Sequence, residues 1–267
     1  MKLRLNPHRT ALPSIFLANV RSLFNKLDEL KIWTLTQKIL MDCNVMFFTE
    51  TWLNNDIPTS AVELEGRSIF RADRTVETTG KSRGGSLCIY VNKTWCMDCV
   101  TVSAHCSADL EYLIVRCRPF YLPREFSCIV AIAVYVPPDA NSKAAMKELS
   151  IAINKLQTKH PDGAFIVTGD FNHCNLRTVH PKFHQNITCF TRGSKTLDHC
   201  YTNVAAAYKV TPLPHLGQSD HISLFLTPKY SPLIKRVNPT TKTVKVWKED
   251  TDPTLQEQFQ HTDWFFR

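Results

Sequence analysis

Several polar residues stand just after short apolar segments of this 267-residue sequence, at points where a β-strand would end. Glu50 follows the segment 44–49, and Asp170 lies just beyond the segment 164–168. The ends of strands hold side chains rigidly at one edge of a sheet, so polar residues there are candidates for a functional site. The other candidates of this kind are Asn19, Tyr135, Asn172, Asp198, Ser219, Asp220 and His221.

Together these residue types suit the cleavage of a phosphodiester. A carboxylate such as Glu50 can hold Mg²⁺ on the phosphate oxygens. Asp170 can take a proton from an attacking water that the amide of Asn172 orients. His221 can donate to a phosphate oxygen as negative charge builds up there, and Asp198 is a candidate to orient that imidazole. This chemistry requires all five side chains to surround one phosphate-sized space.

Each of these residues also has a purely structural interpretation. A carboxylate that follows a strand, such as Glu50, more often caps a turn or a helix. Residues 169–172 could form a simple turn, and the neighbouring Asp220 and His221 could be unrelated to any site. The functional interpretation therefore depends on whether the fold brings the whole set together.

The apolar periodicity predicts a mixed α/β chain with more strands than helices. A helical pattern runs from Leu23 to Ile39, and a second helix, capped by Asn141 or Ser142, continues to Leu156. The predicted strands 44–49 and 164–168 each follow a predicted helix and are each followed by a carboxylate, Glu50 and Asp170. The two halves of the chain therefore show an approximate internal similarity. The predicted strands are 13–18, 44–49, 68–72, 86–91, 112–117, 127–134, 164–168, 197–202 and 222–227.

The composition is that of a globular chain, with 43% hydrophobic and 21% charged residues, which excludes a wholly disordered or fibrous protein. A net charge of +8 favours a polyanionic partner, most often nucleic acid. Beyond residue 227 the chain becomes basic and rich in proline and threonine. We therefore expect one domain over 13–227 and a linker over 228–267, with a short helix near 254–259.

No segment has the pattern of a membrane span or a signal peptide. The longest apolar run, 128–136, is about half of the roughly 20 residues that cross a bilayer. Polar residues also interrupt the N-terminal region, which leaves no apolar signal core. We therefore expect an intracellular protein without a membrane partner.

The ten cysteines are too few for a disulfide scaffold, which takes about 8–10% of a chain. In an intracellular protein we expect them to be reduced and mostly buried. Cys96 and Cys99 form a Cys-x-x-Cys pair, but no second pair follows at a zinc-site spacing. The sequence therefore predicts no structural zinc.

Six segments resemble motifs of the endonuclease/exonuclease/phosphatase superfamily, in order and rough spacing, across residues 13–227. The superfamily fold is a four-layer α/β sandwich, in which two packed mixed β-sheets are flanked by helices. Within it, the segments LANVRSLFNKLDEL, FFTETWL, RGGSLCIYVNK and LDHCYTN resemble the apurinic-type endonuclease domain of non-LTR retrotransposons of the LINE, jockey-like sort. The six segments are 18–20, 49–52, 134–137, 169–172, 196–199 and 219–221.

The resemblance implies a divalent metal, Mg²⁺ or alternatively Mn²⁺. Glu50 would be its principal ligand, with Asn19 supporting the metal and its water and Asp220 nearby. One position departs from the pattern of repair-type apurinic endonucleases, which carry an acid two residues after the asparagine. This chain has Arg21 there, which removes one metal ligand and fits the retrotransposon branch better than a repair enzyme.

The resemblance also implies roles for the remaining candidates. Asp198 would pair with His221, which binds the phosphate. The other implied roles are activation of the nucleophilic water by Asp170, its positioning by Asn172, contact of Tyr135 with the scissile phosphate, and substrate contacts of Ser219 and of Thr188 in an expected strand 188–190.

Three functions remain open at this point. The favoured one is a Mg²⁺-dependent DNA endonuclease that nicks one strand and leaves a 3′-hydroxyl, as target-primed reverse transcription requires. Its partners would be DNA in the nucleus and, in a full-length relative, a reverse transcriptase or the element RNA. The alternatives are a phosphatase of the same fold, since a fold does not determine its substrate, and a non-catalytic nucleic-acid-binding relic or domesticated module.

Overall fold

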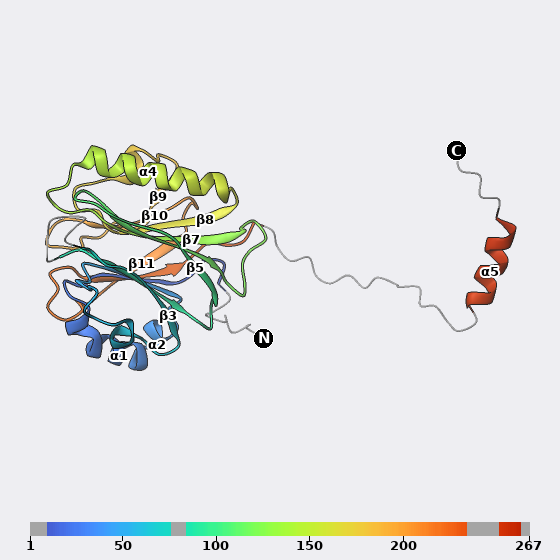
Figure 1. The fold of residues 1–267 in the computed structure, drawn as a ribbon, viewed down its shortest axis with the longest axis horizontal. Coiled ribbons are helices and arrows are strands. Elements are labelled where there is room, and N and C mark those ends of the chain that lie inside the picture. Colours follow the sequence, from blue (N-terminus) through green and yellow to red (C-terminus); the bar gives the residue numbers. More distant parts are fainter. Residues whose placement is uncertain (1–9, 76–83, 234–250, 263–267) are drawn as a thin grey trace. The chain divides into compact units, whose positions relative to one another are not determined.

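The computed structural model describes residues 10–75, 84–233 and 251–262. The chain divides into two compact units, 1–234 and 235–267. The first unit contains two six-stranded β-sheets packed face to face, with helices over the outer face of each (Figure 1). This four-layer arrangement confirms the prediction of two packed mixed sheets flanked by helices.

The first sheet has the strand order β11-β12-β1-β2-β4-β3. Only the central neighbours β1 and β2 run parallel, and the other neighbours in it are antiparallel. Its strands are β1 (Ile15–Asn19), β2 (Val45–Thr49), β3 (Arg67–Ala72), β4 (Leu87–Asn92), β11 (Tyr208–Leu213) and β12 (Ser223–Pro228).

The second sheet has the order β5-β6-β7-β8-β10-β9. Here the central neighbours β7 and β8 are parallel, and the remaining pairs are antiparallel. Its strands are β5 (Asp98–Cys106), β6 (Glu111–Arg118), β7 (Cys128–Tyr135), β8 (Gly163–Asp170), β9 (His184–Gln185) and β10 (Asp198–Thr202). Each sheet therefore has one parallel pair at its centre, whose two strands end at the same edge.

Helix α4 (Ser142–Lys159) lies on the second sheet, and its first turn is capped as the sequence predicts. The side chain of Asn141 accepts hydrogen bonds from the backbone N–H groups of Lys143 and Ala144, which satisfies two donors that the helix leaves unpaired. The other helices in the described part of the chain are α1 (Leu27–Thr36), α2 (Lys38–Met41) and α5 (Thr251–His261), with short 3₁₀ turns η1 (Phe24–Lys26), η2 (Thr59–Val62) and η3 (Leu176–Thr178).

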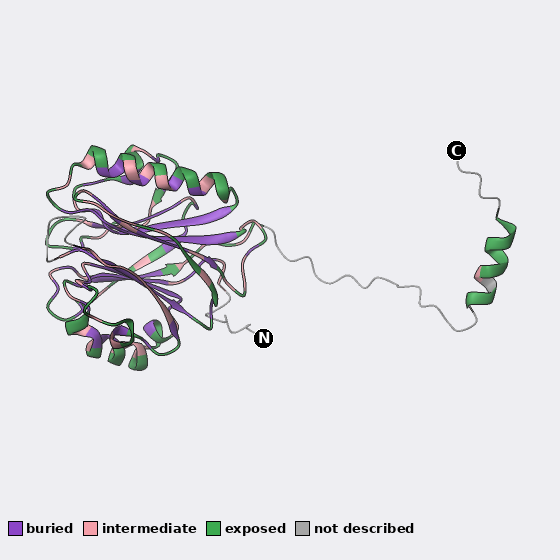
Figure 2. Cartoon of the chain, in the orientation of Figure 1, coloured by how far each residue is buried: buried purple, intermediate pink, exposed green. Residues whose placement is uncertain are grey.

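The central strands are buried on both faces (Figure 2). Side chains alternate along a strand, so Leu17 and Phe47 enter the core between the sheets, whereas Phe16 and Phe48 pack under the helices of the first sheet. Burial on both sides explains why these strands read as continuous apolar runs in the sequence. This rigid double layer positions the polar residues at the strand ends.

The sequence patterns missed three strands, β5, β9 and β11. All three lie at sheet edges and expose part of their residues, so they lack a strong apolar pattern. The single helical pattern predicted from Leu23 to Ile39 is also interrupted, because Gln37 is extended, with φ −95° and ψ 107°. The short helix expected near 254–259 lies within α5. Within the described ranges, no helix is long and apolar enough to span a membrane.

Candidate active site

The two parallel strand pairs deliver four polar residues to one edge of the sandwich. Asn19 ends β1, Glu50 follows β2, Tyr135 ends β7 and Asp170 ends β8. Tyr135 and Asp170 are direct partners in the β7–β8 register, and β1 packs on β8 across the interior. The sheet register and the packing of the two layers therefore bring together residues that are up to 151 positions apart in the sequence.

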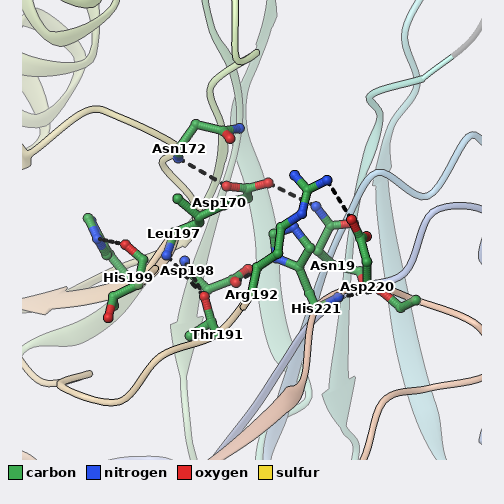
Figure 3. A network of polar contacts seen from close by, with 12 residues as sticks. Asn19, Asp170, Asn172, Thr191, Arg192, Leu197, Asp198, His199, Asp220 and His221 are labelled. Atoms are coloured by element: carbon green, nitrogen blue, oxygen red, sulfur yellow. Dashed lines mark hydrogen bonds and ion pairs between the residues drawn. The ribbon is translucent and has the colours of Figure 1, made fainter. Parts of the chain in front are cut away.

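Asn19 joins the two sheets through its side-chain amide. The Nδ2 group donates to Oδ2 of Asp170 at 2.8 Å (Figure 3). It also donates to Oε1 of Glu50 at 3.0 Å. Asn19 is 1% exposed, and its Oδ1 atom is buried without a hydrogen-bond partner among the described residues. A buried oxygen without a donor is costly unless a water or a cation satisfies it.

Several residues near this edge have strained backbone conformations. Glu50 and Trp52 have φ values of 51° and 55°, and Arg21 and Asn172 have values of 42° and 47°. Non-glycine residues adopt this left-handed region rarely, and such strain tends to occur at functional sites. At Glu50 it turns the half-buried carboxylate so that Oε1 meets Asn19 and Oε2 accepts from the indole of Trp52 at 3.4 Å.

Asp170 is the buried carboxylate at the centre of the site. It is 1% exposed, and its Oδ1 accepts from the backbone N–H of Asn172 at 3.0 Å. Burial raises the pKa of Asp170 to about 8, and the nearby charge of Asp198 adds to the effect. The side chain of Asn172 donates to the carbonyl oxygen of Val136 at 2.8 Å, which leaves its own Oδ1 as an acceptor.

Asp198 and His221 form a buried pair beside Asp170. Nδ1 of His221 lies 2.7 Å from Oδ2 of Asp198, and both residues are almost fully buried. Burial alone would lower the pKa of His221, but the hydrogen bond and charge of Asp198 outweigh it and the pKa is raised. The hydroxyl of Thr191 accepts from the backbone N–H of Asp198 at 3.1 Å and so fixes the start of β10.

Ser219 anchors the segment that carries His221. Its buried hydroxyl donates to the carbonyl oxygen of Asn19 at 2.6 Å and accepts from the backbone N–H of His221 at 3.2 Å. Both contacts are internal to the protein. Ser219 thus positions the imidazole relative to β1, whereas the resemblance implied a substrate contact.

Asp220 faces two arginines. One oxygen lies 2.6 Å from Arg192, and the other lies 3.3 Å from Arg21. Burial alone would raise the pKa of Asp220, but Arg192 and the other neighbouring groups outweigh it and the pKa is lowered. Local patterns did not single out Arg192, because it belongs to a loop and meets Asp220 only in the folded chain (Figure 3).

Thr188 is not placed as expected. Residues 188–190 form an irregular loop instead of the predicted strand, and Thr188 is exposed. The side-chain oxygen of Gln185 accepts from the backbone N–H groups of Ile187 and Cys200, and these bonds replace ladder bonds where β9 ends. Among the described residues, no hydrogen bond joins Thr188 to the other candidates.

Tyr135 lies against a buried ion pair that the sequence patterns also missed. Its strand partner Glu111 pairs with Arg74, whose guanidinium carbon lies 5.7 Å from the centre of the Tyr135 ring. Burial raises the pKa of Tyr135, as do the charges of Glu50 and Asp170. The phenol therefore stays neutral and can act only as a neutral hydrogen-bonding group.

No protein-family model matches the chain, and no curated protein matches it by sequence. Solved structures do match its fold over most of its length. One is the endonuclease domain of TRAS1, a telomere-specific non-LTR retrotransposon, with 14% identity over 82% of this chain and 99% of that one, at a TM-score of 0.56.

Two further matches have the same extent. An endonuclease/exonuclease/phosphatase family protein from Leptotrichia buccalis is 10% identical over 82% of this chain and 100% of its own, at a TM-score of 0.57. The 3′ phosphatase NExo from Neisseria, bound to a product DNA hairpin, is 16% identical over 82% and 100%, at 0.55. The chain has the endonuclease/exonuclease/phosphatase fold.

Members of the endonuclease/exonuclease/phosphatase superfamily are expected to use a divalent cation, and the residues at this edge fit one. Glu50 offers a half-buried carboxylate. Asn19, whose Nδ2 donates to that carboxylate, also carries the buried Oδ1 that has no hydrogen-bond partner among the described residues. Carboxylate and amide oxygens are the ligands that Mg²⁺ takes. Asp220 fits less well as a direct ligand, because two guanidinium groups already occupy it.

Two open pockets adjoin this edge of the endonuclease/exonuclease/phosphatase fold. A pocket of about 850 Å³ is lined by Asn172, Arg192 and Lys195, and another of about 540 Å³ is lined by Arg21, Lys26 and Trp52. Each pocket contains two basic side chains, and each is lined by one of the arginines paired with Asp220. Basic groups in two pockets at one edge of a protein suit an extended polyanion.

Proposed function

We propose that the chain is a metal-dependent phosphodiesterase that nicks one strand of DNA and leaves a 3′-hydroxyl. The observation that carries the proposal is the bridge from Asn19 to Glu50 and Asp170, with the buried Asp198–His221 pair beside it. In this proposal the arrangement would supply a cation site, a base and a phosphate-binding imidazole at one edge. The fold shared with the TRAS1 endonuclease domain supports the same reaction class.

Glu50 and Oδ1 of Asn19 would hold Mg²⁺, with Mn²⁺ as the alternative cation. When bound, the cation neutralises charge that develops on the phosphate oxygens. The ion pairs of Asp220 give that residue another role in this proposal. It holds Arg21 and Arg192 where they can contact phosphates on either side of the scissile one.

Asp170 would accept a proton from the attacking water. A base is most effective when its pKa lies near the working pH, and burial raises the pKa of Asp170 to about 8. Asn172 would position this water through its Oδ1, since its Nδ2 is committed to Val136. The backbone N–H of Asn172 also fixes the Asp170 carboxylate in place.

His221 would donate a hydrogen bond to a non-bridging phosphate oxygen from Nε2, because Nδ1 is committed to Asp198. The raised pKa of His221 favours the cationic ring, and a hydrogen bond donated by the cationic ring is charge-assisted. Tyr135 would contact the same phosphate as a neutral donor. Such fixed donors stabilise charge that appears in the transition state.

DNA is the proposed substrate because charge and fold both favour it. The net charge of +8 and the basic pockets suit an extended polyanion. NExo, which has a similar fold, was solved with a product DNA hairpin. The 3′-hydroxyl would serve as the primer for a reverse transcriptase, and a chromosomal target would require access to the nucleus.

The test is relaxation of supercoiled plasmid by the purified chain with Mg²⁺, with Mn²⁺ and with EDTA. We expect nicked circles with either cation and none with EDTA. Asp170→Asn and Glu50→Gln should each abolish nicking, whereas the exposed Glu63→Gln should not. A DNA polymerase should extend the nicks without prior phosphatase treatment, which reports the 3′-hydroxyl.

The alternative functions predict other results. A phosphatase of this fold would release phosphate from 3′-phosphorylated DNA or inositol phosphates and leave plasmid supercoiled. A non-catalytic binding module would retain DNA with a steep salt dependence and show no Mg²⁺-dependent turnover. Equal nicking by the wild type and Asp170→Asn would reject the proposed site.

A further inference from the structure

Three cysteine thiols meet at one point of the second sheet. Sγ of Cys99 lies 3.3 Å from Sγ of Cys96 and 3.5 Å from Sγ of Cys117, and all three sulfurs lie within 4.8 Å of one another. Cys96 and Cys117 are fully buried, and Cys99 is partly exposed. The cluster therefore lies at the margin of the core between the sheets, and Cys99 is its only partly exposed member.

The fold assembles this cluster from two separate segments. Cys96 lies in the turn that leads from β4 of the first sheet to β5 of the second, and the carbonyl oxygen of Asn92 accepts from its backbone N–H at 3.0 Å. Cys99 lies on β5 and is the direct cross-strand partner of Cys117 on β6. The Cys-x-x-Cys spacing provides two thiols, and the strand register adds a third that the sequence spacing does not reveal.

We propose that Cys96, Cys99 and Cys117 form a three-thiolate site for a thiophilic d¹⁰ cation, Zn²⁺ or Cu⁺. Soft thiolate ligands select these two ions among the common cellular metals. The proposal does not depend on the nuclease activity, and no other part of the chain has to supply a ligand.

The spacing of the sulfurs suits such an ion. A Zn–S bond is about 2.3 Å long, so tetrahedral angles place two sulfur ligands about 3.8 Å apart. The Cys99–Cys96 and Cys99–Cys117 sulfur distances of 3.3 and 3.5 Å lie slightly below that value. The Cys96–Cys117 sulfur distance is at most 4.8 Å, a limit that lies above it. Sub-ångström shifts of the side chains would therefore make all three bonds. A water on the exposed side of Cys99 could complete a tetrahedron around Zn²⁺, while three thiolates alone suit Cu⁺.

The environment of the cluster also favours a cation. Asp98 lies between the two cysteines of the pair, and its carboxylate is half exposed. Sγ of Cys96 lies 3.5 Å from the backbone carbonyl oxygen of Asp98, so the negative charge of this residue lies close to the cluster and favours a cation there.

This site is separate from the candidate active site. Cys117 is aligned with Ile129 near the start of β7, whereas Tyr135 ends that strand at the active-site edge. Six residues of an extended strand span about 20 Å. A cation at the cluster would instead tie the turn after β4 to β5 and β6, at the point where the chain crosses from one sheet to the other.

The first measurement is a titration of the reduced, metal-free chain with Co²⁺, which stands in for Zn²⁺ and gives a thiolate-to-metal charge-transfer band. We expect one Co²⁺ per chain, displaced by one Zn²⁺, in the presence of excess Mg²⁺. Carboxylate ligands do not give this charge-transfer band, so Co²⁺ bound to the active-site acids would not contribute to the signal. A second arm titrates Cu⁺ under anaerobic conditions against a chelator and identifies the preferred ion.

The variants distinguish this cluster from other thiols. Cys99→Ser should weaken binding at least about tenfold, which is the loss caused by removing even an outer-shell partner of a metal ligand. Cys106→Ser, on the same strand and also partly exposed, should bind as the wild type does. Cys117→Ser is buried, so its thermal unfolding without metal is measured first, and Cys99→Ser carries the conclusion if it does not fold.

A stability readout gives an independent check. Zn²⁺ binds the folded chain and should raise the unfolding temperature of the wild type and Cys106→Ser but not of Cys99→Ser. The proposal is wrong if the wild type gives no charge-transfer band, or if Cys99→Ser gives an equal one. It is also wrong if mass spectrometry finds a Cys96–Cys99 or Cys99–Cys117 disulfide in protein kept under reducing conditions.

Discussion

Asn19 and Asp170 belong to different sheets, yet the amide of Asn19 donates to the carboxylate of Asp170 at 2.8 Å. The same amide donates to Glu50 at 3.0 Å. One neutral side chain therefore holds two carboxylates at a defined separation, one as a proposed cation ligand and the other as a proposed base.

Replacing Asn19 with alanine should affect activity more than folding. Both carboxylates lose their shared donor, and a misplacement of about 1 Å can cost about 10²-fold in rate. Loss of hydrogen bonds to charged groups should lower the free energy of unfolding by about 1–3 kcal/mol. Nicking kinetics and urea unfolding check both effects. The exposed Asn154→Ala on α4 is the control, and unchanged nicking in Asn19→Ala would contradict the assigned bridge.

The Asp198–His221 pair should set the alkaline limit of activity. The pKa of His221 is raised above 6.5, so the cationic ring persists below that raised value and is lost as pH rises through it. In Asp198→Asn the charge and the anionic acceptor are gone while burial remains, so the pKa of His221 should fall. The rate should then decline at a lower pH than in the wild type.

The pH–rate profile and an NMR titration of His221 measure this shift, with the exposed Asp162→Asn as the control. An Asp198→Asn profile that falls uniformly, with no change in its alkaline midpoint, would show that Asp198 acts on something other than the protonation of His221.

Arg192 should contribute to DNA binding without reading sequence. Arg192→Ala removes a guanidinium from the wall of the pocket beside Asn172, while Asp220 keeps its contact with Arg21. Binding should weaken by a similar factor for different DNA sequences, and the salt slope should fall by about 1. Fluorescence anisotropy over a range of salt concentrations measures both.

The control for Arg192→Ala is Arg177→Ala, an exposed arginine in η3. A weaker affinity with an unchanged salt slope would mean that Arg192 supports its loop and does not contact a phosphate.

Gly169 should be irreplaceable, because β7 and β8 approach closely just before Asp170. Its φ is 150°, and an added Cβ would lie 1.9 Å from the carbonyl oxygen of Val134. Gly169→Ala should therefore lower the free energy of unfolding by more than about 3 kcal/mol, because the backbone of a packed core must shift.

Gly193→Ala gives a matched comparison. Its φ is 55°, but an added Cβ would meet nothing within 4 Å, so the expected cost is only the left-handed backbone penalty of about 1–2 kcal/mol. Urea unfolding of both variants measures the difference. Equal losses would show that backbone conformation, and not the contact with Val134, decides the effect at Gly169.

Local sequence patterns were sufficient to predict a mixed α/β chain and the strand ends that carry several candidate residues, whereas the two-sheet sandwich followed from the resemblance to the superfamily. The central strands are buried on both faces, so they appear in the sequence as apolar runs. The strand also fixes the position of the polar residue at its end. Asn19, Glu50 and Asp170 are predictable in this way. The Asn141 cap of α4 is predictable as well, because it depends only on neighbouring residues.

Tertiary structure alone decided which distant groups meet. The arginine partners of Asp220, the ion pair of Arg74 with Glu111 and the third thiol at Cys117 depend on strand register and on the packing of two sheets. Edge strands such as β5 carry too few buried residues for a clear apolar period. Side-chain contacts between the two sheets produce no periodic pattern in the sequence, because the number of residues between two contacting side chains depends on the connections between the strands.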